Sequence, residues 1–236
     1  MQISIPAFSR SPYAILVLTS VAIGFLVAVL LMRKFEIKKQ TVIYTCLLTF
    51  VSTLTISLAL AFKITPDGLE YGFSGLGAVI GMISGVFISC IIFKDRSDCV
   101  MASFVAAAPL MYGLAKTGCL LAGCCHGKKY NGPLAVVYHG DNSGSYFPAQ
   151  IIDMAAFILL FFLALLLVLK MKNKVKAVYI ILAVVIPVRY ALEYLRFYHE
   201  GGIIASGQVK VLAAGAVAII IITVWQKICK PGQQQT

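Results

Sequence analysis

Seven long runs of apolar residues, interrupted by few charges, are the feature that most restricts the fold of this chain. A helix needs about 20 apolar residues to cross the hydrocarbon core of a bilayer, and several of the runs reach this length. Because hydrocarbon offers no hydrogen-bond partners to an open backbone, the runs are expected to be helices and not strands. The sequence therefore predicts an all-α integral membrane protein with seven transmembrane helices, at approximately residues 13–32, 41–62, 72–93, 99–121, 149–169, 177–197 and 209–228.

The composition agrees with this class and leaves no room for a separate soluble domain. Hydrophobic residues make up 60% of the 236 residues and charged residues 12%, about half of the roughly 25% that is typical of soluble domains. The longest connection, residues 122–148, is expected to be a loop on the outer side between the fourth and fifth helices. The first run has no small-residue cleavage site after it, so it is predicted to stay as a helix and not to be a cleaved signal peptide. We therefore expect residues 1–236 to form one seven-helix domain.

The net charge of +11 follows from where the basic residues lie along the chain. Twelve Lys and Arg residues fall on the side reached after residues 13–32, and six fall on the opposite side. Because Lys and Arg concentrate in cytoplasmic loops, the N-terminus is predicted to lie outside and the C-terminus in the cytoplasm. The asymmetry accounts for the basic excess, and no nucleic-acid partner is expected.

A stripe of glycines predicts close packing between two helices. Gly77, Gly81 and Gly85 follow one another at i, i+4 and i+8 in the run 72–93, and such small residues let a neighbouring helix approach closely. A contact inside the chain is favoured over a homodimer face.

Charged residues inside the apolar runs are the strongest indication of function. Each costs about 2.5–3.5 kcal/mol at the centre of a membrane helix, so such residues are rarely kept without a role. Lys116, Asp153, Arg189 and Glu193 lie inside predicted helices. Arg196 extends this set, because residues 189, 193 and 196 have spacings of i, i+4 and i+7 and are expected to lie on a single helical face.

Cations outnumber carboxylates in this set. A network with a purely structural role would need only one cation for each anion, whereas Lys116 and two arginines face Asp153 and Glu193. We interpret Glu193 as the group that orients both arginines. The surplus positive charge favours a mobile anion, and a phospholipid phosphate suits the planar fork of arginine. A lipid-phosphate site is therefore favoured over a structural network.

The stretch AKTGCLLAGCCHGKKYNGP, residues 115–133, brings three cysteines and a histidine to the end of the fourth helix. A metal site is not favoured, because adjacent cysteines rarely both reach one ion without strain. Redox chemistry would favour a Cys-x-x-Cys pair. A thiolate nucleophile at Cys124 or Cys125 is an alternative, since basic neighbours lower the pKa of a thiol. Packing in a glycine-rich helix end is narrowly favoured for Cys119, Cys124 and Cys125, and no metal is predicted.

Four short motifs follow one another along the second half of the chain. The first is KTGCLLAGC, which contains Lys116, Gly118, Cys119 and Gly123. The second is FPAQIID, and the third has the pattern Arg-x3-Glu-x2-Arg. The fourth is a Gly-Gln pair at the start of the last helix. The second motif contains Pro148, Gln150 and Asp153, and the third contains Arg189, Glu193 and Arg196. The fourth is Gly207 with Gln208.

With these motifs in this order, the chain resembles the prolipoprotein diacylglyceryl transferase family, multi-pass enzymes of the bacterial inner membrane with seven helices. Lys116 stands where the family has arginine, Cys119 where it has asparagine and Cys124 where it has glutamate. Leu76 replaces a family histidine, which removes one proton acceptor. Tyr13 is only an approximate counterpart of a family tyrosine.

The resemblance implies transfer of a diacylglyceryl group from phosphatidylglycerol to the cysteine thiol of a prolipoprotein signal peptide, with no cofactor or metal. It implies catalytic roles for Lys116, Arg189, Glu193 and Arg196. It implies substrate contacts for Gln150, Asp153, Cys119, Gly118, Gly123, His126 and Gln208.

Three points stay open at the level of sequence. One alternative to the implied reaction is a phospholipid head-group or lipid transferase with a different acceptor. Another is a non-catalytic lipid-binding membrane protein. His126 or His139 is a substitute for the missing proton acceptor, although a solvated loop position is the simpler expectation for each.

Overall fold

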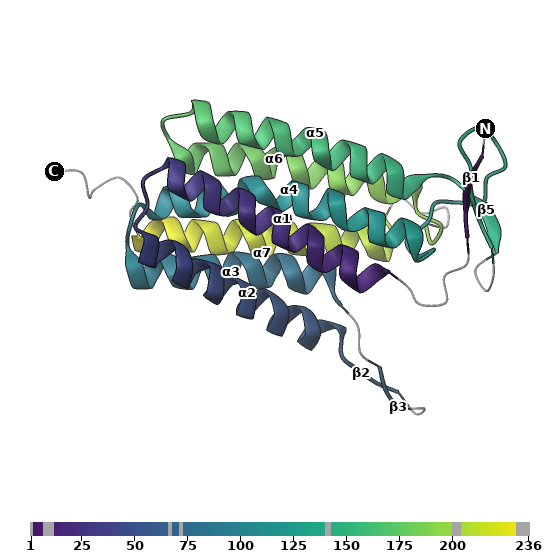
Figure 1. The fold of residues 1–236 in the computed structure, drawn as a ribbon, viewed down its shortest axis with the longest axis horizontal. Coiled ribbons are helices and arrows are strands. Elements are labelled where there is room, and N and C mark those ends of the chain that lie inside the picture. The colour runs from purple at the N-terminus through teal and green to yellow at the C-terminus, as the bar shows by residue number, and fades with distance from the viewer. Residues whose placement is uncertain are drawn as a thin grey trace.

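Seven helices lie side by side as one bundle (Figure 1) in the computed structural model, which describes residues 2–6, 12–65, 68–70, 73–139, 143–199 and 204–229. Each of these seven is long and apolar enough to cross a membrane. The predicted helical membrane fold and number of spans are therefore confirmed for the described part of the chain. The helices are α1 (Tyr13–Lys34), α2 (Lys39–Ala61), α3 (Gly75–Phe93), α4 (Ser97–Leu121), α5 (Ala149–Lys170), α6 (Lys174–Leu192) and α7 (Ser206–Cys229).

The two ends of the bundle differ in structure, and we name them for what they carry. At the sheet end, β1 (Ile3–Ile5) pairs in parallel with β4 (Val136–Tyr138), which pairs antiparallel with β5 (Gly144–Tyr146). The end of α7 lies at the opposite, basic end (Figure 1). A hairpin of β2 (Lys63–Thr65) and β3 (Gly68–Glu70) connects α2 to α3. The strands were not predicted, because each has only three residues; β1 lies before the first apolar run, and the other four lie in connections between runs.

The sixth helix is shorter at its end than predicted. Residues 177–197 were expected to be one helix, but α6 ends at Leu192, a 3-10 turn covers Glu193–Leu195, and Arg196 is extended with φ −74° and ψ 149°. The prediction that Arg196 shares a helical face with Arg189 is therefore wrong. The change of direction turns Arg196 toward the loop that follows α4, as described below.

The glycine stripe of α3 packs against α2 within the chain, as predicted. A Cβ added at Gly81 would lie 2.6 Å from the Ser52 carbonyl oxygen, and one at Gly85 would lie 2.6 Å from the Thr49 Cα. No side chain fits at either point, so the backbones of the two helices are in direct contact.

Gly81→Ala is expected to destabilise the protein by about 1–3 kcal/mol, because the new methyl group forces two packed backbones apart. Thermal unfolding of the detergent-solubilised protein measures the effect. Gly75→Ala is the matched control on the same helix, since a Cβ there meets nothing within 4 Å. Equal unfolding temperatures for the two variants would contradict the packing of α3 on α2.

The fourth helix is the most enclosed of the seven. In α4, 61% of the apolar span is buried, against 44% or less in each of the others. α4 packs on α1, α5 and α6, so a polar side chain on it is surrounded by protein and not by lipid. This position explains how Lys116, 7% exposed, is accommodated within a membrane helix.

Candidate functional site

Charged side chains from α4, α5 and the end of α6 meet near the sheet end of the bundle. Lys116 Nζ lies 3.6 Å from Asp153 Oδ2, and the Arg196 guanidinium forms an ion pair and a hydrogen bond with the same oxygen. All three residues are buried, with Asp153 fully enclosed. One carboxylate thus holds two cations from two different elements, which joins α4, α5 and the segment after α6.

A second ion pair lies beside the first. Arg189, in the last turn of α6, pairs with Glu193 at the start of the 3-10 turn, and the Tyr198 hydroxyl donates a hydrogen bond to Glu193. Glu193 therefore orients Arg189, whereas Asp153 holds Arg196. The prediction that Glu193 orients both arginines is wrong, because the chain leaves the helical path before Arg196.

Tyr112 connects the two ion pairs, and sequence reasoning missed it. Its ring centroid lies 4.6 Å from Lys116 Nζ and 5.5 Å from Arg189 Cζ. The face of an aromatic ring attracts cations, so this ring favours holding two like charges in one buried region. The sequence did contain a signal for this contact, because Tyr112 lies four residues before Lys116 and so on the same helical face.

The predicted surplus of cations is present in the structure. Lys116, Arg189 and Arg196 share two carboxylates, Asp153 and Glu193. The arginines differ in access, because the Arg189 side chain is 20% exposed and that of Arg196 only 1%. An anion that arrives from outside the bundle can therefore reach Arg189, whereas Arg196 is enclosed by its protein partners.

The end of α4 folds back on itself through a Schellman motif. The Cys124 amide donates to the Cys119 carbonyl at 3.1 Å, and the Gly123 amide donates to the Leu120 carbonyl at 3.4 Å. Gly123 has φ 67°, the left-handed conformation that this motif requires and that glycine adopts without strain. Gly123 thus has a structural role at the helix end, and it brings Cys124 back beside Cys119.

Buried side chains fix the backbone of the two following residues. Gln150 Nε2 donates to the Cys124 carbonyl at 2.9 Å and to the Tyr138 hydroxyl at 3.0 Å. Burial raises the pKa of Tyr138 to about 12, so this hydroxyl stays neutral. Arg196 donates to the Cys125 carbonyl. Two residues of the sequence motifs, Gln150 and Arg196, therefore hold the cysteine-bearing turn in place.

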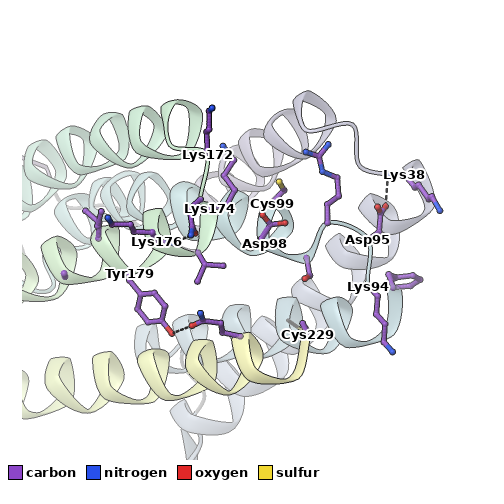
Figure 2. Close-up of a pocket in the computed structure, with 18 residues that line it drawn as sticks. Lys38, Lys94, Asp95, Asp98, Cys99, Lys172, Lys174, Lys176, Tyr179 and Cys229 are labelled. Carbon is purple, nitrogen blue, oxygen red and sulfur yellow. Dashed lines mark hydrogen bonds between the residues drawn. The ribbon is translucent and has the colours of Figure 1, made fainter. Parts of the chain in front are cut away.

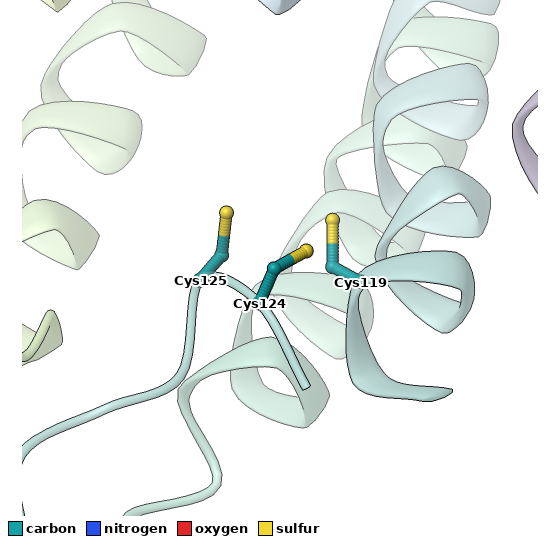
Figure 3. Close-up of side chains that lie close together, drawn as sticks. All are labelled: Cys119, Cys124 and Cys125. Atoms are coloured by element: carbon teal, nitrogen blue, oxygen red, sulfur yellow. The ribbon is translucent and has the colours of Figure 1, made fainter. Parts of the chain in front are cut away.

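The sulfur atoms of Cys119, Cys124 and Cys125 all lie within 4.8 Å of one another. Figure 3 shows them on the same side of the turn. Contacts with the other two thiols, together with the charge of Lys116, lower the pKa of Cys125. The thiols of the adjacent residues Cys124 and Cys125 thus lie close together, with Cys125 in the left-handed conformation (φ 55°) that residues other than glycine rarely adopt.

The histidines fall in three different environments. His126 lies between the rings of Tyr146 and Phe197, tilted against both, with ring centroids 3.9 and 4.4 Å away, so it is not the solvated loop residue that was expected. His139 is exposed, as expected, and its Nε2 forms a hydrogen bond with the Ser4 hydroxyl. Sequence reasoning missed His199, which is 6% exposed beside the Tyr194 ring. It lies three residues after Arg196, and that proximity was its only signal.

The remaining predicted site residues position helices. Gly118 packs against α1, where an added Cβ would lie 3.3 Å from the Tyr13 carbonyl oxygen. Gly207 leaves room for Glu193, since a Cβ there would lie 2.9 Å from the carboxylate carbon. Gln208 is fully buried, and its Oε1 accepts from the Ala205 amide at 2.6 Å, which supports the start of α7.

A large cavity lies at the basic end of the bundle, opposite these charges. It measures about 1080 Å3 and lies between the end of α3, the starts of α4 and α6, and the end of α7 (Figure 2). None of the ion pairs found among the described residues lines this cavity. Its many lysines are residues counted above on the predicted cytoplasmic side, and they include Lys38, Lys94, Lys172, Lys174 and Lys176. The buried charges therefore place the candidate site at the sheet end.

Comparison with known proteins agrees with the motifs. The sequence profile of the prolipoprotein diacylglyceryl transferases matches residues 1–227 of the 236-residue chain, which includes every helix almost completely. No curated protein matches the chain. Since the profile extends from the first residue to the last helix, the likeness is not confined to the four motifs. This multi-pass membrane protein belongs to the prolipoprotein diacylglyceryl transferase family, membrane transferases of lipoprotein biosynthesis.

Proposed function

We propose that the protein transfers a diacylglyceryl group from phosphatidylglycerol to the cysteine thiol of a prolipoprotein in the bacterial inner membrane. The observation that carries the proposal is the accessible Arg189 in a buried cluster with three cations and two carboxylates. Such a cluster favours an incoming anion, and a phosphodiester has the oxygen geometry that an arginine fork binds best. Membership of the family supports the reaction type.

The proposed reaction is a displacement at the carbon that carries the phosphate ester. The acceptor sulfur forms a C–S bond with the diacylglyceryl group, and the C–O bond to phosphate breaks. Glycerol phosphate leaves with the electron pair of that bond, and the thiol proton passes to solvent. Negative charge grows on the leaving phosphate, so fixed cations directed at it lower the barrier. Arg189 is the proposed direct partner, and Lys116, which contacts the same Tyr112 ring, adds to the positive field.

The other motif residues are proposed to position this machinery or the lipid. Glu193 orients Arg189, and Arg196 fixes the cysteine-bearing turn through its bonds to Asp153 and Cys125. Gln150 and Gln208 are proposed contacts for the glycerol head group. Gln150 Oε1 and Gln208 Nε2 are buried with no hydrogen-bond partner among the described residues, so both retain capacity for a ligand.

Mass spectrometry of purified protein with phosphatidylglycerol and a cysteine-containing signal peptide tests the proposal. The expected products are a thioether-linked lipopeptide and free glycerol phosphate in equal amounts. Glycerol phosphate without lipopeptide would indicate a different acceptor. Lipid that copurifies but yields no product would indicate a lipid-binding protein without catalysis.

The basic asymmetry supports an outward N-terminus and a cytoplasmic C-terminus. A C-terminal alkaline phosphatase fusion is therefore expected to be inactive, and a C-terminal green fluorescent protein fusion is expected to fluoresce. An active phosphatase fusion would reverse the proposed orientation and place the basic end of the bundle outside.

A further inference from the structure

We propose that Cys119, Cys124 and Cys125 form a site for a thiophilic divalent cation, Zn2+, with three thiolate ligands and an open fourth position. A Zn–S bond of about 2.3 Å in tetrahedral geometry separates the ligand sulfurs by about 3.8 Å. The three sulfur atoms already lie within 4.8 Å of one another (Figure 3), so small side-chain movements complete the site.

The backbone of this turn solves the difficulty that adjacent cysteines usually present. The Schellman motif returns Cys124 to Cys119, and Gly123 supplies the left-handed step. Cys125 is also left-handed, with φ 55°. Two left-handed residues in three positions reverse the chain tightly, and Cys124 and Cys125 then face the same side as Cys119.

Hydrogen bonds from neighbouring side chains hold this turn in place, as similar bonds orient the ligands of known metal sites. Gln150, 1% exposed, donates to the Cys124 carbonyl, and Arg196, equally buried, donates to the Cys125 carbonyl. Contacts of this kind orient metal ligands, and their loss typically weakens binding about 10–100-fold. The turn is thus bound to α5 and to the segment after α6, and it does not depend on metal for its position.

Charge and access fit a site with one free coordination position. Zn2+ with three thiolates carries one negative charge, and Arg196, which donates to the Cys125 carbonyl, places a cation beside it. Cys124 is exposed, so a fourth ligand can enter from outside the bundle. Three protein ligands with one open position is the arrangement of catalytic zinc sites, whereas structural zinc sites have four.

The open position suggests a use that rests on the proposed transferase function. A thiol that coordinates zinc loses its proton, which here passes to solvent. The acceptor cysteine can therefore bind as the fourth ligand and react as a thiolate. This would supply the deprotonation that the family assigns to a histidine, where this chain has Leu76.

Zinc content of the full-length protein in detergent, purified with reductant and without added chelator, tests the site. We expect one zinc per chain, and after exchange to Co2+ a sulfur-to-cobalt charge-transfer absorption. Cys119→Ser, Cys124→Ser and Cys125→Ser should each lose the zinc. Cys46→Ser, in α2, is the matched control and should keep it. Gln150→Ala should weaken Zn2+ binding about 10–100-fold.

A second measurement uses the unaltered protein and does not depend on the folding of variants. Zn2+ should protect three thiols from iodoacetamide, and a chelator should expose them. Equal labelling with and without Zn2+, or a disulfide among the three cysteines under reductant, would overturn the site. The transfer assay is independent of both readouts. If the protein binds zinc but transfers no lipid, the zinc site is supported and the proposed function is rejected. If Cys125→Ser has no zinc but full transfer activity, zinc has no role in binding the acceptor.

Discussion

Arg189→Lys is expected to lower the rate of diacylglyceryl transfer about 100-fold, the effect typical of losing one donor to a developing negative charge. Lysine keeps the ion pair with Glu193 but loses the planar fork that contacts two phosphate oxygens at once. The fold should persist, because the charge of the pair is conserved. Initial rates with phosphatidylglycerol and the signal peptide measure the loss, and thermal unfolding in detergent shows that the variant is folded.

The matched control for this prediction is Arg33→Lys. Arg33 lies in the last turn of α1, exposed at the basic end of the bundle. The same chemical change there should leave transfer unchanged. Full activity in Arg189→Lys would mean that Arg189 serves only as the partner of Glu193. A different cation would then have to bind the phosphate.

The helices and the charge cluster were predictable because they depend on strong, local sequence signals. Apolar runs specify membrane helices with little influence from tertiary structure. Charges inside such runs must find one another, so Lys116, Asp153 and Arg189 were recognisable before their contacts were known. Their pairing was not, because it depends on the end of α6. No glycine or proline marks that end, and the 3-10 turn at Glu193–Leu195 moves Arg196 toward Asp153.

The cysteine turn shows a different limit of sequence reasoning. Spacing alone argues against a common point for Cys124 and Cys125, because an extended or helical backbone directs adjacent side chains apart. The left-handed conformations at Gly123 and Cys125 change that geometry. Gly123, seven residues after the intramembrane Lys116 and near the end of an apolar run, was a signal for the helix end. Nothing local indicated the left-handed Cys125.

Asp153→Ala is expected to destabilise the protein by about 3–5 kcal/mol, the cost of leaving a buried charge without its partner. Two buried cations, Lys116 and Arg196, depend on this carboxylate, so a single truncation affects both. Thermal unfolding in detergent measures the loss. The double variant Asp153→Ala/Arg196→Met should recover part of it, because it removes one of the two unpaired charges. Recovery in the double variant would assign the instability to the unpaired charge and not to a cavity at position 153. If Asp153→Ala alone unfolds at the temperature of the unaltered protein, Asp153 does not hold these cations, and the end of α6 must be joined to α4 by other contacts.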